Sequence, residues 1–447
     1  MKIARSILVV LVLSVLLLAA CSRISSITGA ASKAKMPNVK EAMESKDVFQ
    51  FGVMLPLTGD AAAYGIPLQN AIELAVTEIN SNGGISGKPV KLVTEDSKCD
   101  PKEGATAAEK LVNVDGVKVI FGGACSGETL GAAPITEAGQ VILISPSATS
   151  PKVTTAGDYV FRLAPSDAGA GEVAAKFAFN TMQYGKIAII SETTDYAQGL
   201  RDVFTKKYTE LGGEIVSDQT FASDASDFRT VALKAQVSSP DAIVLYPQTP
   251  DKGILLLKEL KQAGFNKPIL TAEVLIGRSV AKEHPYETDG IVGFEQAFND
   301  RRGKSKEFMD SYYATYSEDL AFPGFQAGAY DSVYLMKEAI ELNNGVADTD
   351  VIRDYLYNLN GWDGAVGKLT MDGNGDPILS YSVKRVDLGK VSDAGVIRGT
   401  VPAVTTEAMT VSQPAMNEST NSTMESETEM NSTSDVLENE SSVNMTG

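Results

Sequence analysis

Residues 49–94 have the sequence FQFGVMLPLTGDAAAYGIPLQNAIELAVTEINSNGGISGKPVKLVT, which contains two β-rich runs around one helical segment. Residues 49–55 and 90–94 are rich in apolar and β-branched side chains, as strands are. Residues 64–80 repeat apolar side chains every three or four positions, which is typical of an amphipathic helix. Gly83 ends this helix, where a positive φ is needed. The stretch therefore predicts a strand, a helix and a second strand in succession.

The same alternation continues along the chain to about residue 270. Further strands are predicted at residues 117–121, 141–144, 186–190, 214–220, 242–246 and 268–270. Further helices are predicted at residues 105–114, after Ser126, and at residues 197–211, 228–237 and 252–263. Strands that alternate with helices through short loops form parallel sheets with helices on both faces. Two such series predict an α/β protein with two doubly wound parallel-sheet lobes.

The loops at the carboxyl ends of the predicted strands are the expected binding region, because open parallel sheets hold ligands there. These loops cover residues 56–59, 122–126, 145–149, 191–196, 247–250 and 271–274, and they are rich in hydroxyls, carboxylates and aromatic rings. None has the Walker or the G-x-G-x-x-G pattern, so nucleotide binding has no support. Residues 372–376 begin like a calcium loop, but Pro377 stands where that loop requires Gly, so we predict a hairpin turn.

The composition excludes several classes of function. The 447 residues include 57 Asp and Glu against 39 Lys and Arg, and the net charge of −18 argues against nucleic acid as a partner. The one histidine, His284, lies in a predicted polar turn, and the three cysteines are scattered along the chain. Histidine-based catalysis and a zinc site are therefore not expected. We expect a protein that is not an enzyme and has neither a metal nor a cofactor.

The N-terminal residues 1–20 are predicted to be a secretion signal. Two basic residues form a charged start, and the apolar run that follows is shorter than a membrane-spanning helix. The run ends in Leu18-Ala19-Ala20-Cys21, which resembles the lipobox of prokaryotic lipoproteins. The alternative is simple cleavage, with Cys21 incidental. Residues 21–46 are then a lipid anchor and a tether, which attach the protein to a membrane without a transmembrane helix.

Residues 399–447 differ from the rest of the chain, because they include eight acidic residues and no Lys or Arg. Such a segment cannot bury enough apolar surface to offset its ordering entropy, so we expect a disordered tail. It carries five N-x-[ST] glycosylation triplets, which begin at Asn417, Asn421, Asn431, Asn439 and Asn444. Chance in a Ser-, Thr- and Asn-rich stretch is one explanation. Occupied triplets would instead indicate an exported surface glycoprotein of archaeal type.

Several motifs resemble one family over residues 47–390. They are EINSNGGISGKPV (78–90), EDSKCDP (95–101), FGGACS (121–126), ISPSAT (144–149), FRLAPS (161–166) and GKLTMDGNGD (367–376). The chain thereby resembles the type I periplasmic binding proteins, specifically the leucine/isoleucine/valine-binding proteins of ABC importers. In that family two lobes joined by three crossovers close on the ligand by a hinge. The resemblance implies a first lobe from residues 47–166 and 297–380, a second from 167–296 and 381–398, and crossovers near Ser166, Ala297 and Ser380.

The resemblance also implies a disulfide between Cys99 and Cys125, which match the family's paired cysteines. Lipidation of Cys21 would account for the third cysteine. In the loop-entropy view such a bridge contributes roughly 3–4 kcal/mol of stability, and it would hold the loop that contains Ser126. Two buried free thiols are the alternative.

Four residues match the family's contacts to the charged groups of the ligand. A zwitterionic amino acid needs donors for its carboxylate and an acceptor for its ammonium in a closed cleft. Ser126 stands where a strand should meet a helix N-terminus, so it can bind a carboxylate; an ordinary helix cap is the alternative. Thr149 matches a ligand-binding threonine, and Ser147 matches a position with backbone contacts. Glu273 matches the ammonium-binding acid, and a solvated loop charge is its alternative.

Tyr64, Tyr196 and Phe325 match aromatic positions that line the family's side-chain pocket. Large apolar rings suit an aliphatic side chain, although each ring could instead be part of the core. Gln248 departs from the family pattern, because the leucine-binding members have an aromatic residue there. A glutamine leaves open a smaller or more polar side chain on the ligand.

Together the residues and the resemblance predict a monomeric, lipid-anchored, extracytoplasmic protein. It would capture an α-amino acid, with a branched-chain amino acid expected first, and deliver it to an ABC permease. One alternative is the same fold with another solute, such as an amide, an aromatic acid or a peptide. The other alternative is a surface sensor that signals to a partner and transports nothing.

Overall fold

The structure, a computed structural model, describes residues 47–299 and 301–397 of the chain. Within these residues the strands form a five-stranded sheet, a seven-stranded sheet and a two-stranded hairpin. The predicted α/β class with two doubly wound lobes is confirmed. The predicted secretion signal, tether and acidic tail lie outside the described residues.

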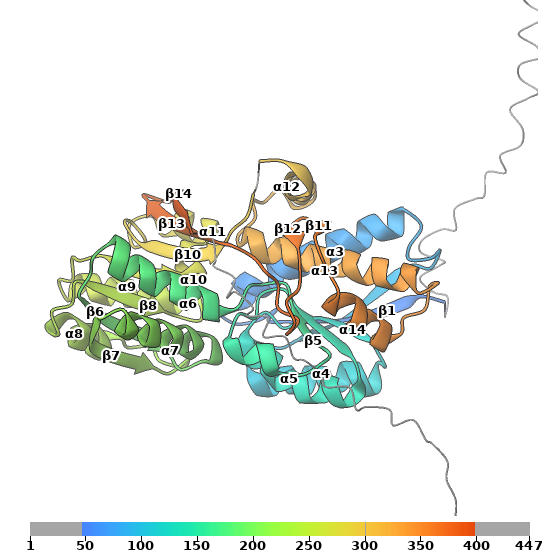
Figure 1. The fold of residues 1–447 in the computed structure, drawn as a ribbon, viewed down its shortest axis with the longest axis horizontal. Coiled ribbons are helices and arrows are strands. Elements are labelled where there is room, and N and C mark those ends of the chain that lie inside the picture. Colours follow the sequence, from blue (N-terminus) through green and yellow to red (C-terminus); the bar gives the residue numbers. More distant parts are fainter. Residues whose placement is uncertain (1–46, 300, 398–447) are drawn as a thin grey trace, which may run out of the picture. The chain divides into compact units, whose positions relative to one another are not determined.

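The first sheet is parallel throughout and has helices on both faces. Its strands lie in the order β2 (Val90–Asp96), β1 (Phe49–Leu55), β3 (Val119–Gly122), β4 (Ile142–Ser145) and β5 (Val160–Arg162). In β1, Val53 and Leu55 pack on one face and Met54 on the other, because successive strand side chains alternate between faces. Helices α3 (Ala62–Ser81) and α13 (Pro323–Leu342) cover one face, and α4 (Pro101–Glu109) and α5 (Ser126–Gly139) cover the other (Figure 1). We call this sheet with its helices the first lobe.

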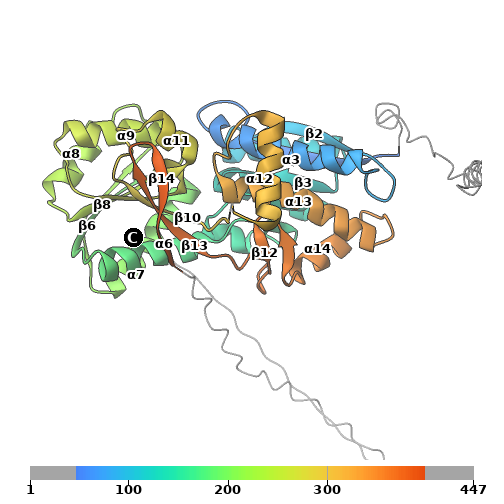
Figure 2. The same cartoon turned by 90° about the horizontal axis from the view of Figure 1, so that it is seen from above.

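The second sheet is mixed, which the alternation of strands and helices did not predict. Its strands lie in the order β14 (Lys390–Ile397), β13 (Tyr381–Asp387), β10 (Val292–Gln296), β9 (Ile269–Ala272), β8 (Ala242–Tyr246), β6 (Lys186–Glu192) and β7 (Glu214–Phe221). The five strands from β10 to β7 are parallel, whereas β13 runs antiparallel to both β10 and β14 (Figure 2). The chain reaches β13 from the first lobe, after α14 and the β11–β12 hairpin and not through a helix that packs on this sheet, so β13 can enter in the opposite direction.

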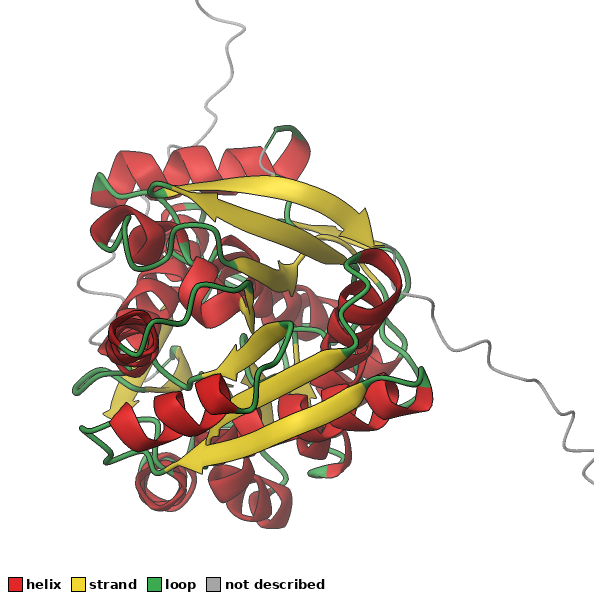
Figure 3. Cartoon of the chain, turned by 90° about the vertical axis from the view of Figure 1, so that its left-hand side faces the viewer, coloured by secondary structure: helices red, strands yellow, loops and turns green. Residues whose placement is uncertain are grey.

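Helices also cover both faces of the second sheet (Figure 3). The helix α6 (Asp167–Lys176) packs against α7 (Asp195–Glu210), and α8 (Arg229–Val237) packs against α9 (Pro250–Gln262). We call this sheet with its helices the second lobe. The remaining α-helices are α10 (Glu273–Ile276), α11 (Arg278–Glu283), α12 (Gly303–Tyr316) and α14 (Thr349–Tyr357), and the hairpin consists of β11 (Trp362–Gly364) and β12 (Gly367–Leu369). Three single turns of 3-10 or π-helix, at Lys110–Val114, Pro151–Thr155 and Phe177–Thr181, complete the helices of the described residues.

The order of strands places a switch point in each sheet. In the first sheet the chain moves from β1 outward to β2 and then returns to the other side of β1 as β3. In the second sheet the same reversal occurs between β6 and β8. Loops that follow the strands on either side of such a reversal leave a crevice between them, which is where open α/β sheets bind ligands.

One helix begins earlier than the apolar pattern predicts. The pattern places its start at residue 105, but α4 begins at Pro101. The side chain of Asp100 caps the helix, because its Oδ1 accepts hydrogen bonds from the backbone N–H of Lys102 at 2.8 Å and of Glu103 at 3.0 Å. A cap followed by proline at the first position sets a helix start independently of the apolar residues.

Arg162, the last residue of β5, is a buried cation that joins three segments of the first lobe. Its side chain is 1% exposed. Its Nη1 donates to the carbonyl oxygens of Thr149 at 3.0 Å and Ser150 at 2.8 Å, in the loop after β4. Its Nε and Nη2 each donate to one carboxylate oxygen of Asp376, both at 2.6 Å. This two-pronged pairing compensates for removing both charges from water.

Asp376 belongs to the turn at residues 372–376, whose sequence begins like a calcium loop. Oδ1 of Asp372 accepts hydrogen bonds from the backbone N–H of Asn374 at 2.8 Å and of Asp376 at 3.0 Å, and Met371 bridges to Pro377 in antiparallel register. The predicted hairpin turn is confirmed. Its role is to present the Asp376 carboxylate to Arg162.

Loss of the Asp376 carboxylate should destabilise the protein strongly. We expect Asp376→Ala to lower the free energy of unfolding by about 3–5 kcal/mol, because it leaves the Arg162 guanidinium buried without a counter-charge. As a control, Arg385→Ala removes an ion pair with Asp387 whose side chains are 52% and 55% exposed, and it should cost less than about 1 kcal/mol. Urea unfolding measures both changes, and equal losses would contradict the role given to Arg162.

Candidate functional site

A pocket lies where the strand-end loops of the two lobes meet. It contains about 300 Å³ of empty space, part of which is continuous with solvent. Its lining residues are Tyr64, Ala124, Cys125, Ser126, Ser147, Tyr196, Gln248, Glu273, Val274 and Phe325. Seven of the eight residues predicted to bind a ligand are therefore brought together, and Thr149 is the one that is not among the lining residues. None of the lining residues is basic.

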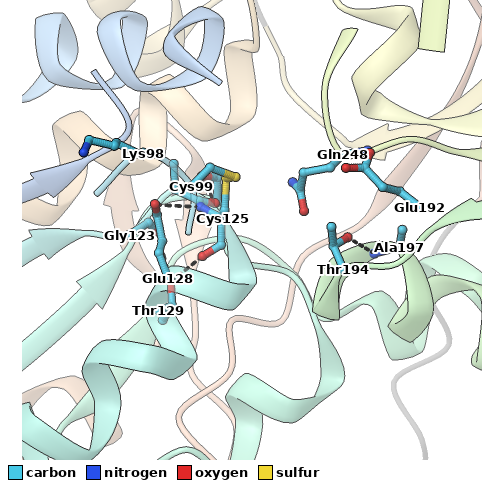
Figure 4. The surroundings of a disulfide bond; sticks show 12 residues. Lys98, Cys99, Gly123, Cys125, Glu128, Thr129, Glu192, Thr194, Ala197 and Gln248 are labelled. Carbon is cyan, nitrogen blue, oxygen red and sulfur yellow. Dashed lines mark hydrogen bonds between the residues drawn. A yellow bond between two sulfur atoms is a disulfide. The ribbon is translucent and has the colours of Figure 1, made fainter. Parts of the chain in front are cut away.

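The loop after β3 is held by the predicted disulfide, which is confirmed. Cys99 and Cys125 are bonded with their Cα atoms 5.3 Å apart (Figure 4). The buried carboxylate of Glu128 accepts a hydrogen bond from the backbone N–H of Cys125 at 2.9 Å, and burial raises the pKa of Glu128 to about 7. These two bonds anchor Cys125, which lines the pocket and immediately precedes α5.

Ser126 is the first residue of α5 rather than its cap, which is Cys125. The alternative interpretation of Ser126 as the helix cap is therefore wrong. Its Oγ accepts a hydrogen bond from the backbone N–H of Ser150 at 3.1 Å, so its own hydroxyl proton is free to be donated into the pocket. The N-terminus of a helix also favours an anion. This end of the pocket can therefore hold a carboxylate.

The loop after β4 brings Ser147 to the pocket and buries Thr149 behind it. The Ser147 hydroxyl donates to the carbonyl oxygen of Ala124 at 2.9 Å, which ties this loop to the loop after β3. The carbonyl oxygen of Thr149 accepts hydrogen bonds from the Asp167 backbone N–H at 2.8 Å and from Arg162. The Thr149 hydroxyl is buried and lies close enough to the Asp167 carboxyl to lower its pKa.

The pocket also has an acidic side, formed by Glu273 with Asp167 close by. Glu273 is the first residue of α10, at the end of β9, and burial raises its pKa to about 7. Burial also raises the pKa of Asp167, at the start of α6, and the nearby charge of Glu273 raises it further. The neighbouring Thr149 hydroxyl offsets part of this rise. Two neighbouring carboxyl groups that are hard to ionise would be stabilised by a cation between them.

Aromatic rings form much of the remaining wall. Tyr64, in the first turn of α3, stacks on Phe322 with ring centroids 4.4 Å apart. Tyr196, in α7, has a buried hydroxyl close enough to Glu273 to lower the pKa of that carboxyl. Phe325 is buried in the first turn of α13 and reaches the pocket. These rings give the pocket an apolar wall beside its charged ends.

Gln248 adds a polar group from the second lobe. It follows β8, and its backbone N–H donates to Oε2 of the buried Glu192 at 2.6 Å. Figure 4 shows Glu192 and Gln248 on the second-lobe side and the disulfide on the first-lobe side. The hydrogen bond holds the loop, and the amide side chain of Gln248 remains available to the pocket.

Sequence reasoning missed Asp167 and Glu192. Asp167 follows the FRLAPS motif directly, and Glu192 lies in the loop 191–196 that was predicted to follow a strand, so both stand where site residues are expected. A search for acidic residues at these ends would have found them. Their proximity to the pocket depends on packing between segments that are distant in the sequence.

Some predictions concern parts of the chain outside the described residues. Lipidation of Cys21 and glycosylation of the five tail asparagines fall there. Among residues 47–299 and 301–397, no group of three or more His, Cys, Asp or Glu side chains could hold a metal ion. In the same part of the chain, no helix combines the length and the apolar character that crossing a membrane requires.

A pocket between the strand-end loops of two doubly wound lobes defines a two-lobed binding protein. The periplasmic-binding-protein family matches residues 48–390, and the chain belongs to that family. The family predicted from the sequence motifs is thereby confirmed.

Curated relatives agree with this assignment. The Leu/Ile/Val-binding protein BraC3 of Rhizobium johnstonii is 29% identical over 344 residues, which cover 76% of this chain and 92% of that protein. The leucine-, isoleucine-, valine-, threonine- and alanine-binding protein of Pseudomonas aeruginosa is 28% identical over 331 residues, which cover 74% of this chain and 87% of that protein. These relatives are binding proteins rather than enzymes.

Solved structures give the same result. The leucine-binding protein LivK of Thermotoga maritima has a TM-score of 0.73 at 28% identity, and LivJ of Streptococcus pneumoniae, in complex with isoleucine, has 0.72 at 29%. Each match covers 78% of this chain and 99% of the other. A Rhodopseudomonas palustris solute-binding protein in complex with 4-hydroxybenzoate also has a TM-score of 0.73, but at 18% identity it shows the fold alone.

The raised pKa of Glu273 should affect stability in the absence of ligand. A carboxyl group whose pKa rises from 4.5 to about 7 on folding lowers the stability of the folded state as the pH rises through that interval. We therefore expect Glu273→Gln to gain about 1–3 kcal/mol over the wild type between roughly pH 4.5 and pH 8.

Urea unfolding at several pH values measures this difference. Buried acids away from the pocket, such as Glu128 and Asp331, titrate in both proteins and cancel when the two are compared, whereas Asp167 is coupled to Glu273 and contributes to the difference. A difference that does not vary with pH would show that burial leaves the Glu273 pKa unchanged.

Proposed function

We propose that the chain is an extracytoplasmic solute-binding lipoprotein that captures an α-amino acid between its two lobes and delivers it to an ABC permease. The observation that carries the proposal is the polarity of the pocket. Glu273 lines the pocket with Asp167 close by, no lining residue is basic, and Ser126 at the N-terminus of α5 lines the pocket as well. An α-amino acid carries its ammonium and carboxylate close together, so it can satisfy both at once.

The ammonium would lie against Glu273 and Asp167, and its charge would favour their ionised forms. The carboxylate would accept the hydroxyl hydrogen bond of Ser126 and lie in the favourable field of α5. Ser147 and Thr149 belong to the adjoining loop that Arg162 holds in place. In this arrangement each of the four residues that match the family's contacts to the charged groups of the ligand has a role: Ser126, Ser147, Thr149 and Glu273.

The ligand's side chain would lie against Tyr64, Tyr196 and Phe325, with the amide of Gln248 beside it. The aromatic rings suit leucine, isoleucine or valine, which the curated relatives are named for. Gln248 also suits a small polar side chain such as threonine, which the name of the Pseudomonas relative includes. A branched-chain amino acid is therefore the proposed cargo, with threonine as a further candidate.

Three segments of chain connect the lobes, and we propose that they act as the hinge on which the lobes close. The lipid anchor at Cys21 and the tether up to residue 46 would keep the protein at the outer face of the cell membrane, close to its permease. The tail would be a glycan acceptor. Genes for a permease and an ATPase beside this gene would support transport, and a receptor kinase gene there would support the sensor alternative.

Replacement of Glu273 tests the proposal. We expect leucine, isoleucine or valine to raise the melting temperature of the wild type, because a ligand that binds only the folded state stabilises it. Glu273→Gln should lose about 3–5 kcal/mol of affinity, because the ammonium loses its partner in a closed site. The measurement is a thermal-shift screen against the amino acids, followed by calorimetric titration of any that bind.

Glu283→Gln is the matched control, because it removes an exposed carboxylate from α11, outside the pocket. It should bind as the wild type does. If Glu273→Gln kept the wild-type affinity, the ammonium site would be wrongly placed. If no amino acid shifted the wild type, the cargo class would be wrong, and amides and aromatic acids would be screened next.

A further inference from the structure

A second cavity adjoins the pocket between the lobes. It contains about 220 Å³ of empty space, part of it continuous with solvent. Its lining residues are Glu273, Glu295, Gln296, Phe322, Pro323, Gly324 and Phe325. Glu273 and Phe325 line the pocket between the lobes as well, so the two hollows adjoin at these side chains. We call the second cavity the side cavity.

The side chain of Gln296 brings unused hydrogen-bonding groups to the side cavity. Gln296 is the last residue of β10, and it is only 5% exposed. Its Nε2 can donate two hydrogen bonds and its Oε1 can accept two, yet neither atom has a hydrogen-bond partner among the described residues. Buried polar atoms are normally hydrogen-bonded, so a free amide that lines a cavity indicates a ligand group that completes its bonds.

The N-terminus of α13 offers further donors beside this amide. The first backbone N–H groups of a helix have no partner within it, and the side chain of the preceding residue, Phe322, does not cap them. Gly324 lies in the first turn of α13, where a Cβ atom would come within 2.9 Å of Cδ of Gln296. Because glycine has no Cβ atom, the amide of Gln296 can lie against the start of the helix.

The charges around the side cavity favour an uncharged ligand group. Glu295 already pairs with Lys384 at 3.4 Å, and in the function proposed above Glu273 receives the ammonium of the ligand. A second carboxylate on the ligand would be repelled by these two acids. A second ammonium would lie beside the positive end of α13. The unused groups of the side cavity therefore suit a neutral group that both donates and accepts hydrogen bonds.

We propose that the side cavity is a subsite for the polar end of the ligand, and that the cargo includes amino acids with a carboxamide side chain, glutamine or asparagine. The proposal rests on the proposed function, because the ammonium and carboxylate of such a ligand would lie in the pocket between the lobes. Its side chain would extend past Phe325, which both hollows share.

The chemistry of two amides explains the selectivity. A carboxamide has the same donors and acceptors as Gln296, so the two groups can exchange a pair of hydrogen bonds. The ligand's carbonyl oxygen keeps a second lone pair for a backbone N–H group of α13. An aliphatic side chain would leave the amide of Gln296 unpaired, so Gln296 is a specificity-determining residue.

Calorimetric titration of the full chain with glutamine and with leucine tests the proposal. We expect both to bind, and we expect Gln296→Leu to weaken glutamine binding roughly tenfold through the lost pair of hydrogen bonds. The same substitution should keep leucine affinity within about twofold or increase it, because it removes an unpaired amide. A merely structural role of Gln296 would change both affinities alike, so the ratio of the two affinities is the decisive readout.

Gly324→Ala is a second and independent variant. Its Cβ atom would displace the side chain of Gln296, so it should also weaken glutamine more than leucine, by about three- to tenfold. Gln262→Leu is the matched control, because it makes the same exchange at an exposed position of α9 outside both hollows. It should leave both affinities within about twofold of the wild type.

Two results would overturn the subsite and leave the proposed function standing. One is a full chain that binds leucine but neither glutamine nor asparagine. The other is equal weakening of leucine and glutamine by Gln296→Leu. If no amino acid bound at all, the proposed function itself would fail, and the subsite would fail with it.

Discussion

The buried charge of Arg162 is the constraint on which the binding region depends. A guanidinium with almost no exposure to water must find partners for its donors, and this one finds them in two places at once. Its bonds to the backbone after β4 set the course of the loop that carries Ser147. Its bond to Asp376 ties the same loop to the segment that leads into β13. One cation therefore links the wall of the pocket to a connection between the lobes.

The same balance of charge explains the composition of the pocket between the lobes. The carboxyl groups of Glu273 and Asp167 lie close together there without a basic lining residue, and burial raises both pKa values. Two like charges side by side cost free energy while no cation lies between them. A positively charged group would therefore be stabilised at this point, as we propose for the ammonium of the ligand.

Local sequence patterns were enough to predict most strands and the loops of the site. The run from residue 49 to 55 and the strand at residues 242–246 are long, apolar and bounded by turns, so their place in a sheet follows from pattern alone. The rule that ligands bind at strand ends then selected loops containing Ser126, Gln248 and Glu273. The early start of α4 was predictable in principle, because Asp100 and Pro101 are a recognisable cap.

Other features depend on contacts that no local pattern encodes. The direction of β13 follows from where the chain enters the sheet, not from its own residues. Arg162 and Asp376 are 214 residues apart in the sequence, and nothing in the sequence of the hairpin turn indicates that Asp376 pairs with Arg162.

The bond between Cys99 and Cys125 has a consequence for the order in which the molecule matures. It encloses α4 and β3 in a loop with a sequence separation of 26, and it ends at Cys125, which caps α5. While the thiols are reduced, hydrogen bonds such as those of Glu128 and Thr129 hold that corner without a covalent link, and the unfolded chain keeps the conformational freedom that the bond removes. Oxidation therefore adds the covalent part of this corner. In a reducing compartment the chain would therefore have every residue of the site but lack the covalent bond that holds the loop before Ser126.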